Sequence, residues 1–100
     1  MEIARAEKES EVLFALSGRL DTGSSPKLQN MLVQDIEAGK SVALDFAGVS
    51  YVSSAGLRVL LIGEKAAKKN AVRQRLVNVS AEIMEVFEMT GFAAILQIEK

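Results

Sequence analysis

The chain has 100 residues, of which 49% are apolar and 25% charged, and its formal net charge is −1 at pH 7. This composition is typical of one small globular domain, so it excludes a disordered chain and gives no reason to expect nucleic acid as a partner. Cysteine and histidine are both absent, which excludes thiolate and imidazole metal sites and removes the most common general base of enzymes.

The sequence carries no targeting signal that we can recognise. No apolar run approaches the roughly 20 residues that span a bilayer, and residues 1–11 are charged without an apolar signal core. We therefore expect a cytoplasmic protein that is not exported and does not insert into a membrane.

The first 40 residues predict two strands and a helix. Residues 3–6 and 12–16 favour short strands, and the polar segment between them is typical of a hairpin, so the strands are expected to be antiparallel neighbours. A loop over 18–25 follows, after which Pro26 suits the first turn of a helix with Ser25 as its N-cap. The residues that define this helix are one apolar face and a left-handed glycine at its end: Leu28, Met31, Leu32, Ile36 and Gly39.

The rest of the chain alternates strands with helices. Strands are predicted over 41–46, within 72–79 and over 95–98, and the register of the middle one stays open. A strongly apolar helix begins near Ala55 and ends near Asn70, and a third helix is capped by Ser80 and closed by Gly91. The order is ββαβαβαβ over residues 1–100, which indicates a single small α/β domain with helices packed on a mixed, mostly parallel sheet.

Ser53 and Ser54 lie between the strand over 41–46 and the apolar helix, after a short polar break. The simplest interpretation is that one of them caps the helix, because a hydroxyl accepts a hydrogen bond from an unpaired N–H of the first turn. Capping does not explain Gly56, which costs roughly 1 kcal/mol of helix propensity relative to alanine. A glycine in the first turn indicates that something approaches this helix closely.

Two catalytic or nucleotide-binding interpretations fit poorly. A serine nucleophile needs a base, but the chain has no histidine, the G-x-S-x-G elbow is missing, and Lys65 lies about 15 Å away along the helix. The phosphate loop G-x-x-x-x-G-K-[ST] is also missing, since no lysine follows Gly56 and Arg58 is the nearest cation. We therefore expect no catalytic residue, no cofactor and no metal, and no enzyme activity.

A last interpretation places a phosphoryl group on the serine itself. A phosphoserine at a helix N-terminus carries a charge of about −1.5 to −2 that faces unpaired N–H groups and the positive end of the dipole. Such a modification changes the surface that a partner contacts without requiring the domain to refold.

The stretch "LDFAGVSYVSSAGLRVLL" resembles the signature of the STAS domain family, the anti-sigma factor antagonists and their relatives. The matching positions are Asp45, Tyr51, Val52, Ser54, Ala55, Gly56 and Leu57. The segments 16–28 and 77–92 are also similar to the family's Gly-x-Leu-Asp loop and third helix, so the resemblance covers nearly the whole chain.

The resemblance implies a partner switch. Antagonists of this family bind an anti-sigma factor that is itself a serine kinase, and the sigma factor is released; phosphorylation of the signature serine dismisses the antagonist, and a serine phosphatase restores it. Carried onto this sequence, the phosphoacceptor is Ser54, and Asp21 matches an acidic residue near it. The expected partner-binding residues are Asp21, Thr22, Ser53, Ser54, Ala55, Gly56 and Arg58.

One position departs from the family pattern. The residue before the phosphoacceptor is usually aspartate, and here it is Ser53. Family members that are not phosphorylated also exist, so a constitutive STAS subunit of a signalling scaffold or a membrane-transport complex is the alternative. Modification of Ser53 in place of Ser54 also stays open. The basic residues between 65 and 75 are interpreted as a solvated helix end and strand edge, not as a nucleic-acid patch.

Overall fold

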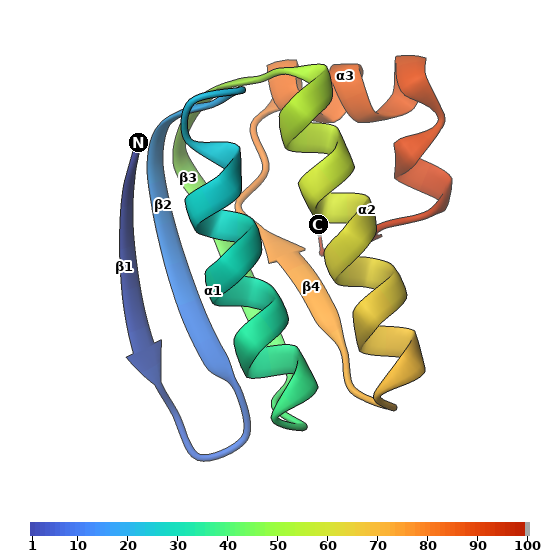
Figure 1. The fold of residues 1–100 in the computed structure, drawn as a ribbon. Coiled ribbons are helices and arrows are strands. Elements are labelled where there is room, and N and C mark those ends of the chain that lie inside the picture. The colour runs from blue at the N-terminus through green and yellow to red at the C-terminus, as the bar shows by residue number, and fades with distance from the viewer. Residues whose placement is uncertain (100) are drawn as a thin grey trace.

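A computed structural model describes residues 1–99 and has the predicted element order (Figure 1). The elements are β1 (Glu2–Glu7), β2 (Val12–Leu20), α1 (Ser25–Glu37), β3 (Val42–Val52), α2 (Ser54–Lys69), β4 (Gln74–Val77), α3 (Ala81–Thr90), a 3-10 turn (Phe92–Ala94) and β5 (Gln97–Ile98). The α/β class and the order ββαβαβαβ are therefore confirmed.

The five strands form one sheet in the order β1-β2-β3-β4-β5. β1 and β2 are antiparallel, as the hairpin predicts, and every other neighbouring pair is parallel. Figure 1 shows α1 and α2 side by side over one face of the sheet, with α3 at the end of the sheet where both of these helices begin. That end therefore gathers the beginnings of α1 and α2.

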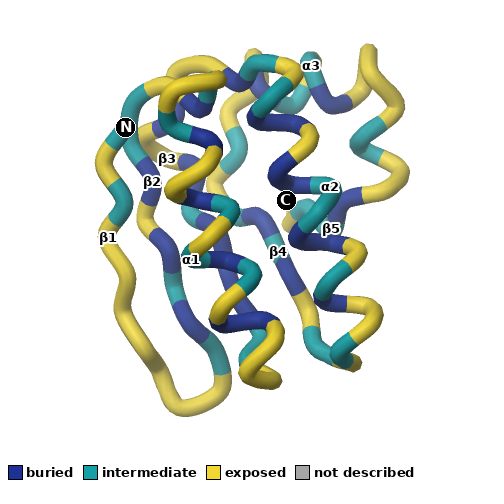
Figure 2. Tube along the Cα trace, viewed as in Figure 1, coloured by how far each residue is buried: buried dark blue, intermediate teal, exposed yellow. Residues whose placement is uncertain are grey.

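The core lies between the sheet and the two helices, where the inner faces are dark blue in Figure 2. The predicted helix face is confirmed, because Leu28, Leu32 and Ile36 are buried and Met31 packs against them at the edge of the core. The third helix closes the end of the core. Its Phe87 meets Phe46 of β3 edge-on, with ring centroids 6.2 Å apart, a favoured geometry for an aromatic pair.

β1 gains one residue at each end relative to the sequence prediction, and two other strands are extended much further. β2 continues past residue 16 to Leu20, and β3 continues past residue 46 to Val52, through the segment interpreted as a polar break. Backbone pairing does not depend on side-chain polarity, and the two extensions pair with each other across two register shifts. Gly48 permits this approach, because a Cβ there would lie 2.8 Å from the Cβ of Ser17. The C-terminal ends of both strands consequently lie side by side, where Leu20 pairs with Val52.

The predicted helix ends are correct with one exception. Ser24, not Ser25, is the N-cap of α1, and Ser25 is instead buried with its hydroxyl donating to the carbonyl of Asp21. The predictions for the other termini are confirmed, with Gly39 and Gly91 at φ +84° and +81° and with Asn70 and Ser80 at their expected caps. The last strand is shorter than predicted and spans only Gln97–Ile98. The 3-10 turn over Phe92–Ala94 ends at Ile95, whose backbone is still helical, so the strand starts after it.

Ion pairs gather at the end of the sheet away from α3. Arg5 of β1 donates to both carboxylate oxygens of Asp35 on α1, at 2.8 and 2.7 Å, and Glu7 lies 3.2 Å from Arg5 and 2.9 Å from Lys40. The hydrogen bonds from Arg5 lower the pKa of the Asp35 carboxyl, and Lys40 and then Arg5 lower the pKa of Glu7. The antiparallel edge strand is thus tied to the first helix.

A second cation, Arg75 of β4, connects the residue before β2 with the residue after the edge strand β5. It donates to Glu11 and lies 2.8 Å from Glu99. The hydrogen bond from Arg75 lowers the pKa of the Glu11 carboxyl.

These lowered pKa values predict acid destabilisation. A carboxyl whose folded pKa is depressed contributes its full stability above its unfolded pKa, about 4 for Asp and Glu, and loses it as the pH falls through the folded pKa. The unfolding free energy should therefore decrease once the pH is lowered below about 4. Asp35→Asn should lower it at pH 7 and flatten its decline toward pH 3, as measured by urea unfolding. An unchanged pH slope in this variant would contradict the role of the Arg5–Asp35 pair.

Candidate functional site

The turn between β3 and α2 separates the roles of its two serines. Ser53 has an extended backbone, and its hydroxyl accepts a hydrogen bond from the N–H of Gly56 at 3.3 Å, so it is the N-cap of α2. Its own N–H donates to the carbonyl of Leu20 at 2.9 Å. Ser53 is thus held at both its side chain and its backbone, and the capping role that the sequence left open belongs to it.

Ser54 is the first residue of α2, and it is exposed. Among the hydrogen bonds of residues 1–99, none involves the Ser54 hydroxyl. Because Ser53 already caps the helix, the Ser54 hydroxyl is available to a reagent or a partner from outside.

Gly56 lies on the buried side of the same turn. A Cβ at this position would be 2.7 Å from both the carbonyl oxygen and the Cγ of Leu20, and 3.1 Å from a methyl of Val52. The close approach that the sequence indicates is therefore made by the protein's own β2. Gly56 seats the helix, and its neighbours Ser54 and Ala55 face outward to the groove described below.

Asp21 begins the loop that faces the serine turn. Its Oδ1 accepts the N–H groups of Gly23 at 3.1 Å and Ser24 at 3.2 Å, and Arg19 lies 3.6 Å from its Oδ2. The bond from the Ser24 N–H is the main reason why the pKa of Asp21 is lowered. The carboxylate thus shapes its own loop.

Arg19 is a residue that sequence reasoning missed. Its guanidinium stacks over the Tyr51 ring, 4.0 Å from the centroid, and Tyr51 remains 40% exposed. Only the observed register, which pairs Arg19 with Tyr51, brings the two together, since both lie in strand extensions that the sequence did not predict. This cation–π pair adds an exposed aromatic surface beside the serine turn.

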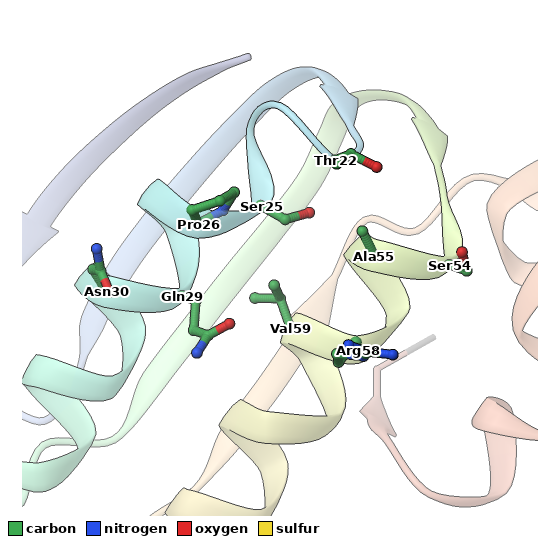
Figure 3. Close-up of a pocket in the computed structure, with 9 residues that line it drawn as sticks. All are labelled: Thr22, Ser25, Pro26, Gln29, Asn30, Ser54, Ala55, Arg58 and Val59. Atoms are coloured by element: carbon green, nitrogen blue, oxygen red, sulfur yellow. The ribbon is translucent and has the colours of Figure 1, made fainter.

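A groove of about 400 Å³ runs between the first turns of α1 and α2 (Figure 3). It contains four of the residues expected from the sequence, Thr22, Ser54, Ala55 and Arg58, whereas Asp21, Ser53 and Gly56 lie outside its lining. The lining also includes residues that were not expected: Ser25, Pro26, Gln29, Asn30 and Val59. The four-residue spacing of Ser25 and Gln29 predicts that they share one face of α1. Only the packing of α1 beside α2 places that face in the same groove as Ser54.

Residues 1–99 show neither a group of three or more carboxylates placed to hold a metal ion nor a helix long and apolar enough to cross a membrane. The chemistry that remains at this surface is that of the exposed Ser54 and Thr22 hydroxyls, one guanidinium, and the amide and hydroxyl groups of the other residues that line the groove. Such a set can bind a protein surface and accept a phosphoryl group.

Comparison with known proteins identifies the family. A family model of the STAS domain matches residues 2–100. The chain belongs to the STAS domain family. The predicted resemblance is therefore confirmed over essentially the whole sequence.

The anti-sigma-B factor antagonist of Bacillus subtilis is 30% identical to this STAS domain over 92% of the chain and 84% of the relative. Among solved structures, SpoIIAA, an anti-sigma factor antagonist of Bacillus, shares the fold in its unphosphorylated form, with a TM-score of 0.80 at 19% identity over 99% of this chain and 88% of that one. Its phosphorylated form matches with a TM-score of 0.77 at 20% identity, over 99% and 92%.

Replacing the capping serine tests its separation from Ser54. Ser53→Ala should lower the unfolding free energy by about 1 kcal/mol, and Ser53→Asp should retain stability because aspartate caps equally well and suits the dipole. Ser54→Ala is the matched control and should change stability by less than about 0.5 kcal/mol. Equal losses in both alanine variants, measured by urea unfolding, would contradict the assignment of the cap to Ser53.

Gly56→Ala tests the seat of the helix. Alanine favours a helix by about 1 kcal/mol over glycine, but its methyl would collide with the Leu20 carbonyl, and overpacking of this kind typically costs about 1–3 kcal/mol. We expect a net loss in unfolding free energy by urea titration. A more stable Gly56→Ala variant would show that α2 does not need this contact.

Proposed function

We propose that this STAS domain is an anti-sigma factor antagonist whose binding is switched by phosphorylation of Ser54. The observation that carries the proposal is the exposed Ser54 hydroxyl at the start of α2, released from capping by Ser53 and placed at the rim of the groove. The names of the relatives support the same function: the Bacillus subtilis protein and SpoIIAA are both anti-sigma factor antagonists.

In this proposal the partner is an anti-sigma factor with serine kinase activity. The unphosphorylated domain binds it through the groove and the Asp21 loop, and the sigma factor is released. Residues 1–100 act as one STAS domain in the cytoplasm without a cofactor or a catalytic centre of their own, and a separate serine phosphatase reverses the modification.

The modification is a phosphoryl transfer from ATP. The oxygen of Ser54 bonds to the γ-phosphorus, the bond from that phosphorus to the β–γ bridging oxygen breaks, and the hydroxyl proton and ADP leave. The product places about −1.5 to −2 charges at the first turn of α2, where the dipole favours an anion. The fold need not rearrange, and SpoIIAA supports this because both of its forms match this chain.

Ser53 is compatible with this mechanism although aspartate is usual in the family. Its hydroxyl provides the cap that an aspartate would provide. What Ser53 lacks is the negative charge, so the cognate kinase has to accept an uncharged residue before the phosphoacceptor.

Incubation with the cognate kinase and ATP tests the proposal. The wild type and Ser53→Ala should each gain one phosphoryl group by intact-mass spectrometry, and Ser54→Ala should gain none. Labelling of Ser54→Ala would refute the assigned site. A wild type that binds its anti-sigma factor but is never labelled would favour the constitutive STAS subunit.

A further inference from the structure

The groove beside Ser54 carries a single charge. Among the nine side chains drawn in Figure 3, Arg58 is the one that is charged, and its neighbours are hydroxyl, amide and apolar groups. The first turns of both α1 and α2 line the groove, and the beginnings of helices add positive potential. The groove is therefore electropositive around Arg58.

Arg58 also differs from the other four arginines, each of which has a partner within the fold. Arg5, Arg19 and Arg75 each lie within 4 Å of an acidic side chain, and Arg73 donates a hydrogen bond to the side chain of Gln97 at 3.1 Å. Within residues 1–99, no acidic group pairs with the exposed guanidinium of Arg58. The fold therefore does not need this charge, which leaves it available to a ligand.

Ser54 and Arg58 are four residues apart on α2 and lie one turn apart at the rim of the groove (Figure 3). Side chains at this spacing are neighbours on a helix, and an anion N-terminal to a cation is the more favourable order. A phosphoryl group on Ser54 would therefore lie within reach of the guanidinium, whose planar fork binds phosphate through two parallel hydrogen bonds.

We propose that Arg58 is the contact through which the switch acts. In the unphosphorylated domain its guanidinium binds an acidic side chain of the anti-sigma factor at the groove rim. After modification, the phosphate on Ser54 binds Arg58 within the same helix and withdraws it from the partner. The proposal rests on the function proposed above, and the complementary charge of the groove is the reason for assigning a carboxylate to the partner.

The intramolecular half can be tested without a kinase or a partner. Phosphoserine is installed at position 54 during translation, and the second ionisation of the phosphate, with a pKa near 6 in the absence of neighbours, is followed by phosphorus NMR. The proton affinity of the phosphate should be about threefold or more lower in the wild type than in Arg58→Gln. Lys65→Gln removes a cation from the same helix about three turns from Ser54, and this variant should match the wild type. Equal values in all three proteins would overturn the proposal.

The partner half is measured by titration calorimetry with the purified anti-sigma factor. Arg58→Gln should weaken binding of the unphosphorylated domain by about tenfold or more, and Lys65→Gln should change it by less than about twofold. Urea unfolding of Arg58→Gln should match the wild type. Unchanged affinity in Arg58→Gln, or a change that follows its stability, would overturn the proposal.

The ratio of the affinities of the unphosphorylated and phosphorylated domains reports on the link between the two halves. If phosphorylation acts by withdrawing Arg58, this ratio should be several-fold smaller in Arg58→Gln than in the wild type, because the contact is already lost. An unchanged ratio would mean that Arg58 has no part in the switch. A larger ratio would mean that Arg58 only reduces the repulsion between the phosphate and the partner. Either result overturns the proposal.

These measurements separate the two proposals. Absence of kinase labelling at Ser54 would refute the proposed function, while the phosphorus NMR comparison would still report whether Arg58 binds the installed phosphate. Conversely, normal labelling of Ser54 with unchanged binding by Arg58→Gln would leave the proposed function standing and overturn the role of Arg58.

Discussion

The contact between the first turn of α2 and the end of β2 is the constraint on which the candidate site depends. Gly56 leaves no room for a side chain against Leu20, and the N–H of Ser53 donates to the carbonyl of the same leucine. These two contacts fix where the helix begins relative to the sheet. Because the helix is seated by residues 53 and 56, the position of the exposed Ser54 between them is determined by packing and not by any contact of its own.

The adjacent serines divide two tasks that one residue could not perform together. A hydroxyl that accepts the N–H of Gly56 is engaged in the fold, and its modification would sacrifice the cap. With Ser53 in that role, Ser54 can be modified while the helix terminus remains satisfied. The serine that departs from the family pattern thus supports the role that we propose for its neighbour.

Charge is distributed unevenly between the two ends of the sheet. At the end away from α3, Arg5 and Arg75 are tied to carboxylates that bridge strands and α1. At the other end, Arg19 lies close to Asp21, but Arg58 is exposed beside a groove whose other lining residues are uncharged, and within residues 1–99 no acidic side chain pairs with it. Ion pairs within the fold contribute to stability and leave no free charge for a partner to bind. An unpaired cation near a modifiable hydroxyl instead responds to the charge that a phosphoryl group adds to that hydroxyl.

The sequence by itself determined the α/β order, the apolar face of α1, most helix termini and the serine turn, because periodicity, capping residues and glycines act over a few neighbouring positions. It did not determine the lengths of β2 and β3, since pairing of residues 17–20 with 48–52 depends on a neighbouring strand and not on local polarity. It also left open which serine caps the helix. The groove exists only because α1 packs beside α2, and the Arg19–Tyr51 stack exists only because two strands pair. Residues distant in the chain make these features, so only the tertiary structure decided them.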